Sequence, residues 1–463
     1  MNRLIFSKFT HIFEKEKMVA YYNSLKLNPI FVEKEFREIL SCFENGYNPQ
    51  KFLSKIDDVE IKDMLKSLLK SLIEQKILLR HPSEDEKEKR IHLAKISKPY
   101  IHVAFFLLTN DCNYACKYCF VREPMSSNFK TMTMTKEIAL KGLDLYTRLI
   151  HQDEDLIHQE KVIVFYGGEP LMNFPVLQFT IEKIEQYRQQ EKLPRHLKLL
   201  MVTNGSLITE EKADFLKKHN VTVTFSIDGD EKENLYRILS NGKPGFSSTV
   251  RGYKICQEKG LDINIACTLT PQNVSEGEKT IKSFAEYYKV KRIGFNMLLD
   301  NGITTVPDWY NKKASEFIIK AHNIFRKKGI RENRMTRKLE AFNKSKVYLY
   351  DCMAGGGRQM AIAPDGGIGI CHEDTWNQKN YVTNVNETNF NPAKSAAYLE
   401  WANRTPLKMD QCQSCFALGI CGGGCLINAK YKGSIWEIDE RFCVQSKTIL
   451  EWMIWNLYES LVV

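Results

Sequence analysis

The sequence predicts an α/β protein in which strands and helices alternate through the middle of the chain. Three observations lead to this fold class. Apolar runs of strand length recur between residues 98 and 300, amphipathic helical segments separate them, and the composition is that of an ordinary globular protein, 43% apolar and 26% charged over 463 residues. Such alternation is typical of a parallel sheet with helices outside it.

Six apolar runs are expected as the strands of this sheet. They are HVAFFLLT (102–109), VIVFYG (162–167), LKLLMVTNG (197–205), VTVTFSIDG (221–229), INIACTLT (263–270) and RIGFNML (292–298). Helical segments such as TKEIALKGLDLYTRLI (135–150) and EEKADFLKKH (210–219) lie between them. Loops at the C-terminal ends of parallel strands are the usual place for chemistry, so functional residues are expected in these loops.

Two further regions are predicted on the N-terminal side of the sheet. Residues 1–80 show two strand-like segments followed by amphipathic helices, which suggests a winged-helix-like domain; a helical cap is the alternative. Residues 81–97 are densely charged and are expected as a linker or an exposed helix.

Three regions follow the sheet. Residues 301–350 are polar and helical and are expected to form a bridge, and residues 351–445 are rich in cysteine and glycine with little helix. Residues 446–463 are predicted to form an amphipathic helix that packs on the protein. Its apolar face consists of Ile449, Trp452, Met453 and Leu457.

Composition excludes several classes of protein. No apolar run reaches eighteen residues, and the first residues, MNRLIFSKFTHIFEKEK, lack the features of a secretory signal, so a cytoplasmic protein without a membrane partner is expected. The net charge of +10 fits an ordinary soluble surface as well as an acidic partner. Thirteen cysteines in such a chain point to metal binding or redox chemistry and not to disulfides.

A cysteine-rich loop follows the first predicted strand. Cys112, Cys116 and Cys119 have the spacing C-x3-C-x2-C. Three thiolates on one loop can hold three irons of a [4Fe–4S] cube and leave the fourth iron open to a ligand. Zinc would normally take a fourth protein ligand, and the neighbouring sequence supplies none. The spacing therefore favours an iron–sulfur cluster as the catalytic centre.

This motif, with Tyr118 before its last cysteine, resembles the signature of the radical S-adenosylmethionine (SAM) enzymes over residues from about 100 to 300. The resemblance implies a partial (β/α)6, TIM-like barrel. In that family the open iron binds the amino and carboxylate groups of SAM. One electron, from a reductant such as flavodoxin or ferredoxin, cleaves the sulfonium, and the 5′-deoxyadenosyl radical then abstracts a hydrogen atom from the substrate.

The resemblance also implies SAM-binding residues at the ends of successive strands. Gly167, Gly168 and Glu169 match the family's GGEP segment, in which glycine permits close backbone approach and the glutamate accepts hydrogen bonds from the SAM ammonium. The other expected SAM contacts are Phe120 under the adenine, Asn204, Ser226, Asp228 and the carboxylate-binding Arg237. Core packing explains Phe120 equally well.

Seven further cysteines form a second set whose spacing resembles the SPASM domain of peptide-modifying radical SAM enzymes. The resemblance implies two auxiliary [4Fe–4S] clusters, and therefore three clusters in all. Cys412, Cys415, Cys421 and Cys443 would hold a distal cluster, and Cys352, Cys371 and Cys425 a proximal one. A zinc ribbon built on the C-x2-C pair is the alternative, and it leaves Cys352, Cys371 and Cys443 unexplained.

The proximal cluster has only three cysteine ligands in this reading. Sulfatase-maturating relatives carry a further cysteine shortly after the first, and residues 353–370 contain none. The fourth iron is therefore open or bound by Asp351, His372 or Glu373, which are near in sequence. The remaining thiols, Cys42, Cys256 and Cys267, are predicted to be buried and inert.

The resemblance as a whole predicts a radical SAM/SPASM oxidoreductase of RiPP biosynthesis, which closes a carbon–carbon or thioether cross-link in a ribosomally synthesised precursor peptide. Residues 1–80 resemble PqqD-like recognition elements, which add the leader peptide to a sheet edge. The alternatives are a sulfatase-maturating (formylglycine-generating) enzyme, a peptide epimerase and a zinc-containing nucleic-acid-binding regulator. A nucleic-acid partner is disfavoured because a recognition helix should be richer in Arg, Asn and Gln than residues 59–75, which have the pattern of a packed helix.

Overall fold

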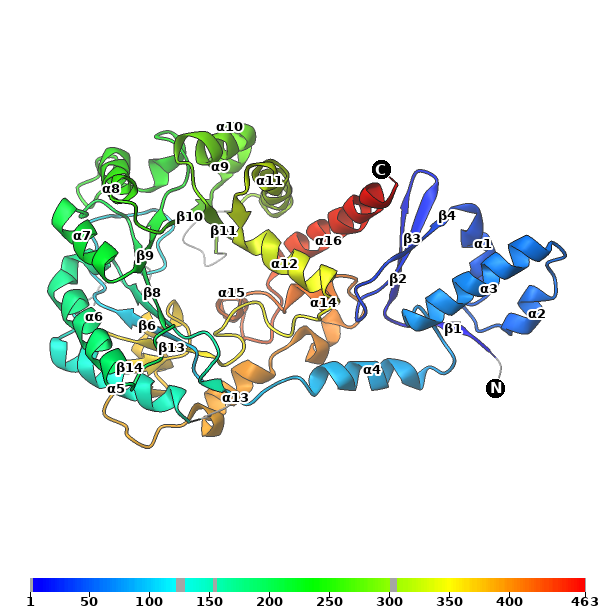
Figure 1. Cartoon of the computed structure of the whole chain (residues 1–463), viewed down its shortest axis with the longest axis horizontal. Coiled ribbons are helices and arrows are strands. Elements are labelled where there is room, and N and C mark those ends of the chain that lie inside the picture. The colour runs from blue at the N-terminus through cyan, green and yellow to red at the C-terminus, as the bar shows by residue number, and fades with distance from the viewer. Residues whose placement is uncertain (1–2, 122–129, 153–155, 300–305, 463) are drawn as a thin grey trace.

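The computed structural model describes residues 3–121, 130–152, 156–299 and 306–462. Its centre is a curved sheet with the strand order β12-β11-β10-β9-β8-β7-β6-β13-β14-β15 (Figure 1). The strands are β6 (Val103–Leu107), β7 (Val162–Tyr166), β8 (Lys198–Thr203), β9 (Val221–Ser226), β10 (Ile263–Leu269), β11 (Arg292–Met297), β12 (Arg331–Glu332), β13 (Gln359–Ile362), β14 (Gly367–Gly369) and β15 (Thr383–Asn384). All six predicted strands are present as β6–β11, and they pair in parallel.

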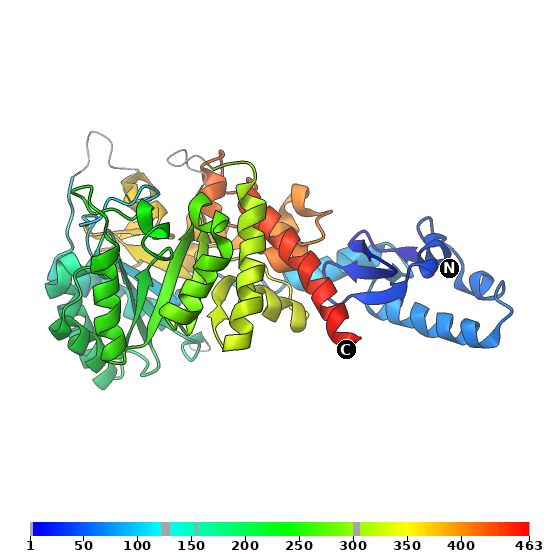
Figure 2. The same cartoon turned by 90° about the horizontal axis from the view of Figure 1, so that it is seen from above.

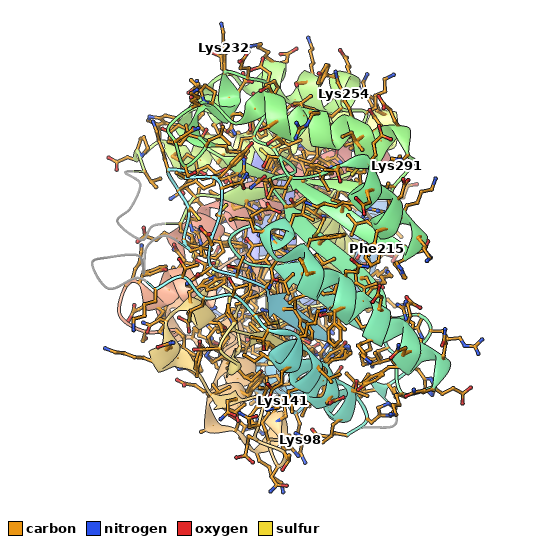
Figure 3. The ribbon with its side chains drawn as sticks, turned by 90° about the vertical axis from the view of Figure 1, so that its left-hand side faces the viewer. Lys98, Lys141, Phe215, Lys232, Lys254 and Lys291 are labelled. Carbon is orange, nitrogen blue, oxygen red and sulfur yellow. The ribbon has the colours of Figure 1, made fainter. Side chains whose placement is uncertain are left out.

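Helices cover the outer face of this sheet, as the alternating pattern predicts (Figure 3). They are α5 (Lys136–Ile150), α6 (Phe174–Gln189), α7 (Glu210–Lys218), α8 (Phe246–Glu258), α9 (Pro271–Ser275) and α10 (Gly277–Lys282). Phe106, Ile163 and Phe165 join the core that these helices share. Because successive strand residues face opposite sides, Phe105, Leu107 and Tyr166 face the inside of the curve. The inner face belongs to a separate apolar cluster, described below.

The predicted bridge and C-terminal helix stand side by side at the end of the barrel (Figure 2). The bridge consists of α11 (Tyr310–Phe325) and α12 (Asn333–Asn343), and the C-terminal helix is α16 (Glu440–Leu461). Ile449 and Met453 of α16 are buried as predicted, and Trp452 packs edge-on against His322 of α11. The helix begins six residues earlier than expected, so that Cys443 lies on its first turn.

The cysteine-rich region has short helices, as expected, and also contributes to the central sheet, which was not expected. Its helices are α13 (Ala396–Asn403), α14 (Leu418–Cys421) and α15 (Leu426–Lys430). Strand β13 pairs in parallel with β6, the strand that precedes the first cysteine loop. This pairing brings the two cysteine sets to the same end of the molecule, although they are more than 200 residues apart in sequence.

The N-terminal module contains more structure than the sequence predicts. Its elements are β1 (Ile5–Phe6), β2 (Thr10–Lys15), β3 (Met18–Asn23), β4 (Ile30–Glu33), α1 (Glu35–Ser41), α2 (Pro49–Leu53), α3 (Val59–Glu74) and β5 (Leu78–Leu79). Strands β2, β3 and β4 form an antiparallel sheet. One face of this sheet packs on the module's own helices, and the other face packs on the rest of the protein through Phe13 and Phe416, whose rings lie 5.3 Å apart.

The charged stretch after this module is a helix, α4 (Ser83–Leu93), and not a free linker. Asp85 is buried and accepts hydrogen bonds from the Ser7 hydroxyl at 2.5 Å and the Lys8 backbone N–H at 3.0 Å. These bonds fix α4 to the start of the N-terminal module. The charge pattern could not reveal this, because a buried acceptor and a solvated one have the same sequence signature.

The three cysteines outside the two sets are predicted to be buried, and the structure confirms this for two of them. Cys256 and Cys267 are buried as predicted. The prediction is wrong for Cys42, which is half-buried because α1 buries only Leu40 in the module core. Within the described ranges, none of the helices has the length and apolar character that a membrane crossing requires.

Candidate active site

The first cysteine loop lies at the C-terminal end of β6 and is held by backbone hydrogen bonds. The N–H groups of Ala115 and Lys117 donate to the carbonyls of Ile238 and Tyr236, at 2.7 and 2.9 Å. The Tyr114 N–H donates to the Cys112 sulfur at 3.3 Å. The loop is therefore fixed against the segment that follows β9, and its thiols have a defined place over the barrel.

The two glycines after β7 make their close approach to this loop. A Cβ on Gly168 would lie 2.1 Å from the Asp111 carbonyl oxygen, and Gly167 has φ +140°. The absence of side chains lets the Gly168 N–H reach the Thr109 carbonyl at 2.7 Å and the Glu169 N–H reach the Asp111 carbonyl at 2.9 Å. The glycines therefore set the position of the cysteine loop.

Burial and the neighbouring thiols disfavour the ionisation of two thiols of the loop, Cys112 and Cys116. Burial raises the pKa of Cys112 to about 12, and Glu169, Cys116 and Cys119 add to the effect. Burial likewise raises the pKa of Cys116 to about 11, which Arg237 opposes. Thiols in this state need cations to ionise together, and the irons of a cluster supply that charge. The donor set therefore fits an iron–sulfur cluster.

Glu169 is fully buried beside these thiols, and its carboxylate is held by three donors. The Thr203 hydroxyl donates to it at 2.7 Å, the Asn204 N–H at 2.8 Å and the Leu171 N–H at 3.1 Å. A carboxylate has about four acceptor positions, so one remains for a ligand donor such as an ammonium group. Burial raises the pKa of Glu169, and these hydrogen bonds oppose that rise.

Asn204 joins the Glu169 pocket to the cysteine loop. Its side-chain amide donates to the Asn113 side chain at 2.9 Å and lies 3.8 Å from the Cys112 sulfur. Ser226 is the last residue of β9 and pairs with Ala266 of β10. Both predicted residues therefore lie at the C-terminal end of the strands, on the same side of the sheet as the cysteine loop.

Asp228 and Arg237 meet through Tyr118, a connection that sequence reasoning missed. The Tyr118 hydroxyl donates to the Asp228 carboxylate, and Arg237 donates to the Tyr118 oxygen at 2.8 Å. The Thr268 N–H holds the other Asp228 oxygen at 2.9 Å. The Arg237 Nε is buried and has no hydrogen-bond partner among the described residues, so the guanidinium fits an additional anionic ligand such as a carboxylate.

Phe120 lies in an aromatic cluster on the inner face of the barrel. Its ring is parallel to that of Tyr166 at 6.4 Å and edge-on to His372 at 6.1 Å. His372 in turn stacks on Phe105 at 4.3 Å. Burial lowers the pKa of His372 to about 4, so the ring is neutral at pH 7. Phe120 therefore packs against the wall of the site, between the two cysteine sets.

The four thiols expected to hold the distal cluster are gathered at one place. After burial, the largest effects that raise the pKa of Cys443 come from Cys421, Cys412 and Cys415, and that pKa reaches about 12. Cys421 and Cys415 raise the pKa of Cys412 in the same way, to about 11. In the described part of the chain, no three His, Cys, Asp or Glu side chains lie close enough to hold a single metal ion.

The three thiols of the expected proximal cluster are also neighbours. Burial raises the pKa of Cys371, and Glu373, Cys425 and Cys352 raise it further. Glu373 is likewise the strongest charge acting on Cys425, whose pKa burial raises to about 12. The carboxylate of Glu373 therefore lies on the same side as these two thiols.

The other two ligand candidates have different partners. The Asp351 carboxylate forms ion pairs with Arg334 at 3.1 Å and Arg337 at 3.6 Å. His372 stacks on Phe105, and its Nδ1 lies 3.5 Å from the Gln359 amide nitrogen. Burial raises the pKa of Cys352, and Asp351 raises it further, so this carboxylate also lies near a proximal thiol.

A buried ion pair joins the cysteine-rich region to the barrel. Arg441 of α16 contacts Asp439 at 2.9 Å and donates to the backbone carbonyls of Met297 and Leu298 at 3.1 and 2.7 Å. Asp439 also accepts from the Cys425 N–H at 3.1 Å. This network fixes a proximal cysteine relative to the end of β11.

Comparison with known proteins agrees with this geometry. Residues 106–284 match the family model described as "Radical SAM superfamily", so the chain carries a radical SAM domain over these residues. The chain is 26% identical to "Radical SAM cyclopropyl synthase TigE" of Paramaledivibacter caminithermalis, over 97% of this chain and 96% of that protein. It is 28% identical to the "Serine-type anaerobic sulfatase-maturating enzyme" of Bacteroides thetaiotaomicron, over 35% of this chain and 38% of that protein.

Solved structures show the same fold. "Native anSMEcpe with bound AdoMet" has a TM-score of 0.65 and 20% identity, covering 77% of this chain and 99% of that one. "Native anSMEcpe with bound AdoMet and Cp18Cys peptide" has a TM-score of 0.64 and 19% identity, covering 78% of this chain and 99% of that one. The structure therefore has the radical SAM α/β fold with a mostly parallel central sheet.

Proposed function

We propose that this radical SAM enzyme modifies a ribosomally synthesised peptide and closes a carbon–carbon cross-link within it. The observation that carries the proposal is the three-thiol loop, gathered with Glu169, Asp228 and Arg237 at the C-terminal ends of the strands. The relative that extends over 97% of this chain is named a cyclopropyl synthase, and a cyclopropyl ring is made of carbon–carbon bonds. This favours a carbon–carbon bond over a thioether.

SAM bound to the first cluster would supply a 5′-deoxyadenosyl radical that abstracts a hydrogen atom from the peptide. In this proposal Glu169 accepts a hydrogen bond from the amino group of SAM, and Arg237 binds its carboxylate through the buried Nε. Asp228 and Tyr118 hold Arg237 in place. The barrel's part is to position one C–H bond and to exclude competing hydrogen donors.

The auxiliary clusters are proposed to accept the electron that remains after bond formation. Cys412, Cys415, Cys421 and Cys443 would hold the distal cluster, and Cys352, Cys371 and Cys425 three irons of the proximal one. Glu373 is proposed as the fourth proximal ligand, because its carboxylate acts on both Cys371 and Cys425, whereas that of Asp351 acts on Cys352. A flavodoxin or ferredoxin in the cytoplasm would supply the first electron.

The N-terminal module is proposed to bind the leader part of the precursor. Its sheet has the order β2-β3-β4, so β2 and β4 each lack a second partner strand among the described residues. An extended peptide can add to such an edge through main-chain hydrogen bonds. Ile61 and Met64 of α3 are exposed and offer apolar contact on the same module.

The test is co-expression with the short open reading frame that neighbours the gene, followed by mass spectrometry of the peptide. A cross-link removes the mass of two hydrogen atoms, and tandem fragmentation locates the joined residues. Purified enzyme with dithionite and SAM should form deoxyadenosine. Replacing Cys112, Cys116 and Cys119 by Ala should abolish both products, and persistence of deoxyadenosine in that variant would refute the proposed active site.

Formylglycine formation is the second candidate, because the fold matches anSMEcpe with a TM-score of 0.65. The sulfatase-maturating relative of Bacteroides matches over only 35% of this chain, and residues 353–370 lack the additional cysteine. Conversion of a sulfatase-derived peptide by the purified enzyme would favour this candidate. An unchanged peptide mass with deuterium uptake from heavy water would instead indicate an epimerase.

A further inference from the structure

The inner wall of the barrel between the two cysteine sets is apolar and largely aromatic. Its buried members come from β6, from the first cysteine loop, from β13 and from the turn after Cys371: Leu107, Val121, Ala361 and Trp376. Phe105, Cys119, Phe120 and Tyr166 pack against them. The wall therefore joins the first cysteine loop to the region that holds Cys371.

Tyr166 is the central member of this wall. It is the last residue of β7, pairs with Leu107 of β6, and directly precedes the Gly167–Glu169 segment. Its ring lies 5.1 Å from His372, 6.0 Å from Phe105 and 6.4 Å from Phe120. Cys119 of one set and Cys371 of the other both act electrostatically on its hydroxyl. Tyr166 therefore stands between the two groups of thiols.

The hydroxyl of Tyr166 makes no hydrogen bond to any described residue, although phenol groups in protein interiors usually find a partner. Tyr118, Tyr146 and Tyr288 follow that rule, since the structure gives each hydroxyl a partner. The buried hydroxyls of Tyr21 and Tyr22, in the N-terminal module, likewise have no partner among the described residues. Tyr166 is only half-buried, and its side chain lies on the inner face of the sheet. A donor placed there is available to a ligand.

We propose that Tyr166 is a substrate-binding residue, whose hydroxyl donates a hydrogen bond to a backbone carbonyl of the peptide beside the reacting residue. The inference rests on the proposed function. The Phe120 ring is parallel to the Tyr166 ring and the His372 ring is edge-on to it, so these contacts hold the hydroxyl in place before the peptide arrives. The hydrogen bond sets which C–H bond lies nearest to the radical, and so couples SAM cleavage to product formation.

The test compares the holoenzyme with its Tyr166→Phe variant. The substrate is the precursor peptide encoded by the open reading frame next to the gene. Tyr187→Phe is the matched control, because it removes a hydroxyl that contacts Asp144 on the outer helices. Iron content, deoxyadenosine formed and cross-linked peptide are measured in the same reaction. We expect Tyr166→Phe to retain its iron and to form deoxyadenosine, while cross-linked peptide per deoxyadenosine falls about tenfold, the effect of one lost hydrogen bond. The control should match the wild type.

Each outcome bears on the inference. An unchanged ratio of product to deoxyadenosine in Tyr166→Phe overturns it, and so does a loss of iron, which would indicate a role in the cluster site. Wild-type enzyme that cleaves SAM but leaves the peptide unmodified refutes the proposed function and the inference with it. Wild-type activity with an unaffected variant refutes only the inference, so the two failures are distinguishable.

Discussion

Replacing Gly168 by alanine tests whether this glycine sets the position of the first cysteine loop. The added Cβ would lie 2.1 Å from the Asp111 oxygen and 2.6 Å from the Asp111 carbonyl carbon. Ordinary contact begins near 3.5 Å, so the loop would have to move by roughly 1 Å or more. That movement breaks the hydrogen bonds from Gly168 to Thr109 at 2.7 Å and from Glu169 to Asp111 at 2.9 Å.

The expected cost in free energy of unfolding is about 2–6 kcal/mol, because each of the two buried backbone bonds that are lost leaves groups unsatisfied at about 1–3 kcal/mol. A displaced Cys112 should prevent assembly of the first cluster and leave the auxiliary sites intact. Anaerobic reconstitution should therefore give about eight irons per chain in place of about twelve, with no deoxyadenosine. Iron and sulfide analysis, with the absorption spectrum, provides the measurement.

Gly277→Ala is the matched control. Gly277 begins α10, and a Cβ there meets nothing within 4 Å, so this variant should match or slightly exceed the wild type in stability. If Gly168→Ala retains its full iron content and forms deoxyadenosine at the wild-type rate, the steric reasoning is wrong. Loss of iron in both variants would show that the effect is not specific to the loop.

Three further predictions concern the auxiliary region and the helices that support it. Glu373→Gln should alter the electron paramagnetic resonance signal of one auxiliary cluster, whereas Glu387→Gln in an exposed loop should not; identical spectra would exclude Glu373 as a ligand. Asp439→Ala leaves the buried Arg441 unpaired and should cost about 3–5 kcal/mol, seen in calorimetry as a lower unfolding temperature; an unchanged temperature contradicts the buried pair. Burial lowers the pKa of His322 from 6.5 to about 4, so the folded protein favours the neutral ring. The contribution of His322 to the free energy of unfolding is therefore fully present above pH 6.5 and decreases as the pH falls towards 4. His322→Gln should flatten that part of the pH–stability curve, and an unchanged slope would assign the acid sensitivity to other groups.

The strands and helices of the barrel could be predicted because their signal is local. Apolar runs such as VIVFYG and VTVTFS alternate with amphipathic helices, and each run becomes a strand in the structure. The C-terminal helix was also predicted from its apolar face. The helix starts six residues before its predicted start. Tertiary contacts of Asp439 and Arg441 hold this first part of the helix, and the apolar periodicity does not extend to it.

The candidate site was predicted in part, for a related reason. Cysteine spacing is a local property, so Cys112, Cys116 and Cys119 were identified without the fold. Tyr118 carried a signal as a motif residue, but its bonds to Asp228 and Arg237 connect segments more than 100 residues apart. Tyr166 carried no signal at all, since an aromatic residue at the end of a strand is ordinary in sequence.

The order of strands and helices can be predicted from spacing along the chain, and so can the sets of thiols that act together. Which of these groups face one another depends on how the chain folds. Pairing of β13 with β6 brings Cys371 and Cys119 to the same inner wall, where both act on Tyr166, and folding places the Glu373 carboxylate near Cys371 and Cys425. Burial and electrostatics act through space, and distances between remote segments exist only once the chain has folded.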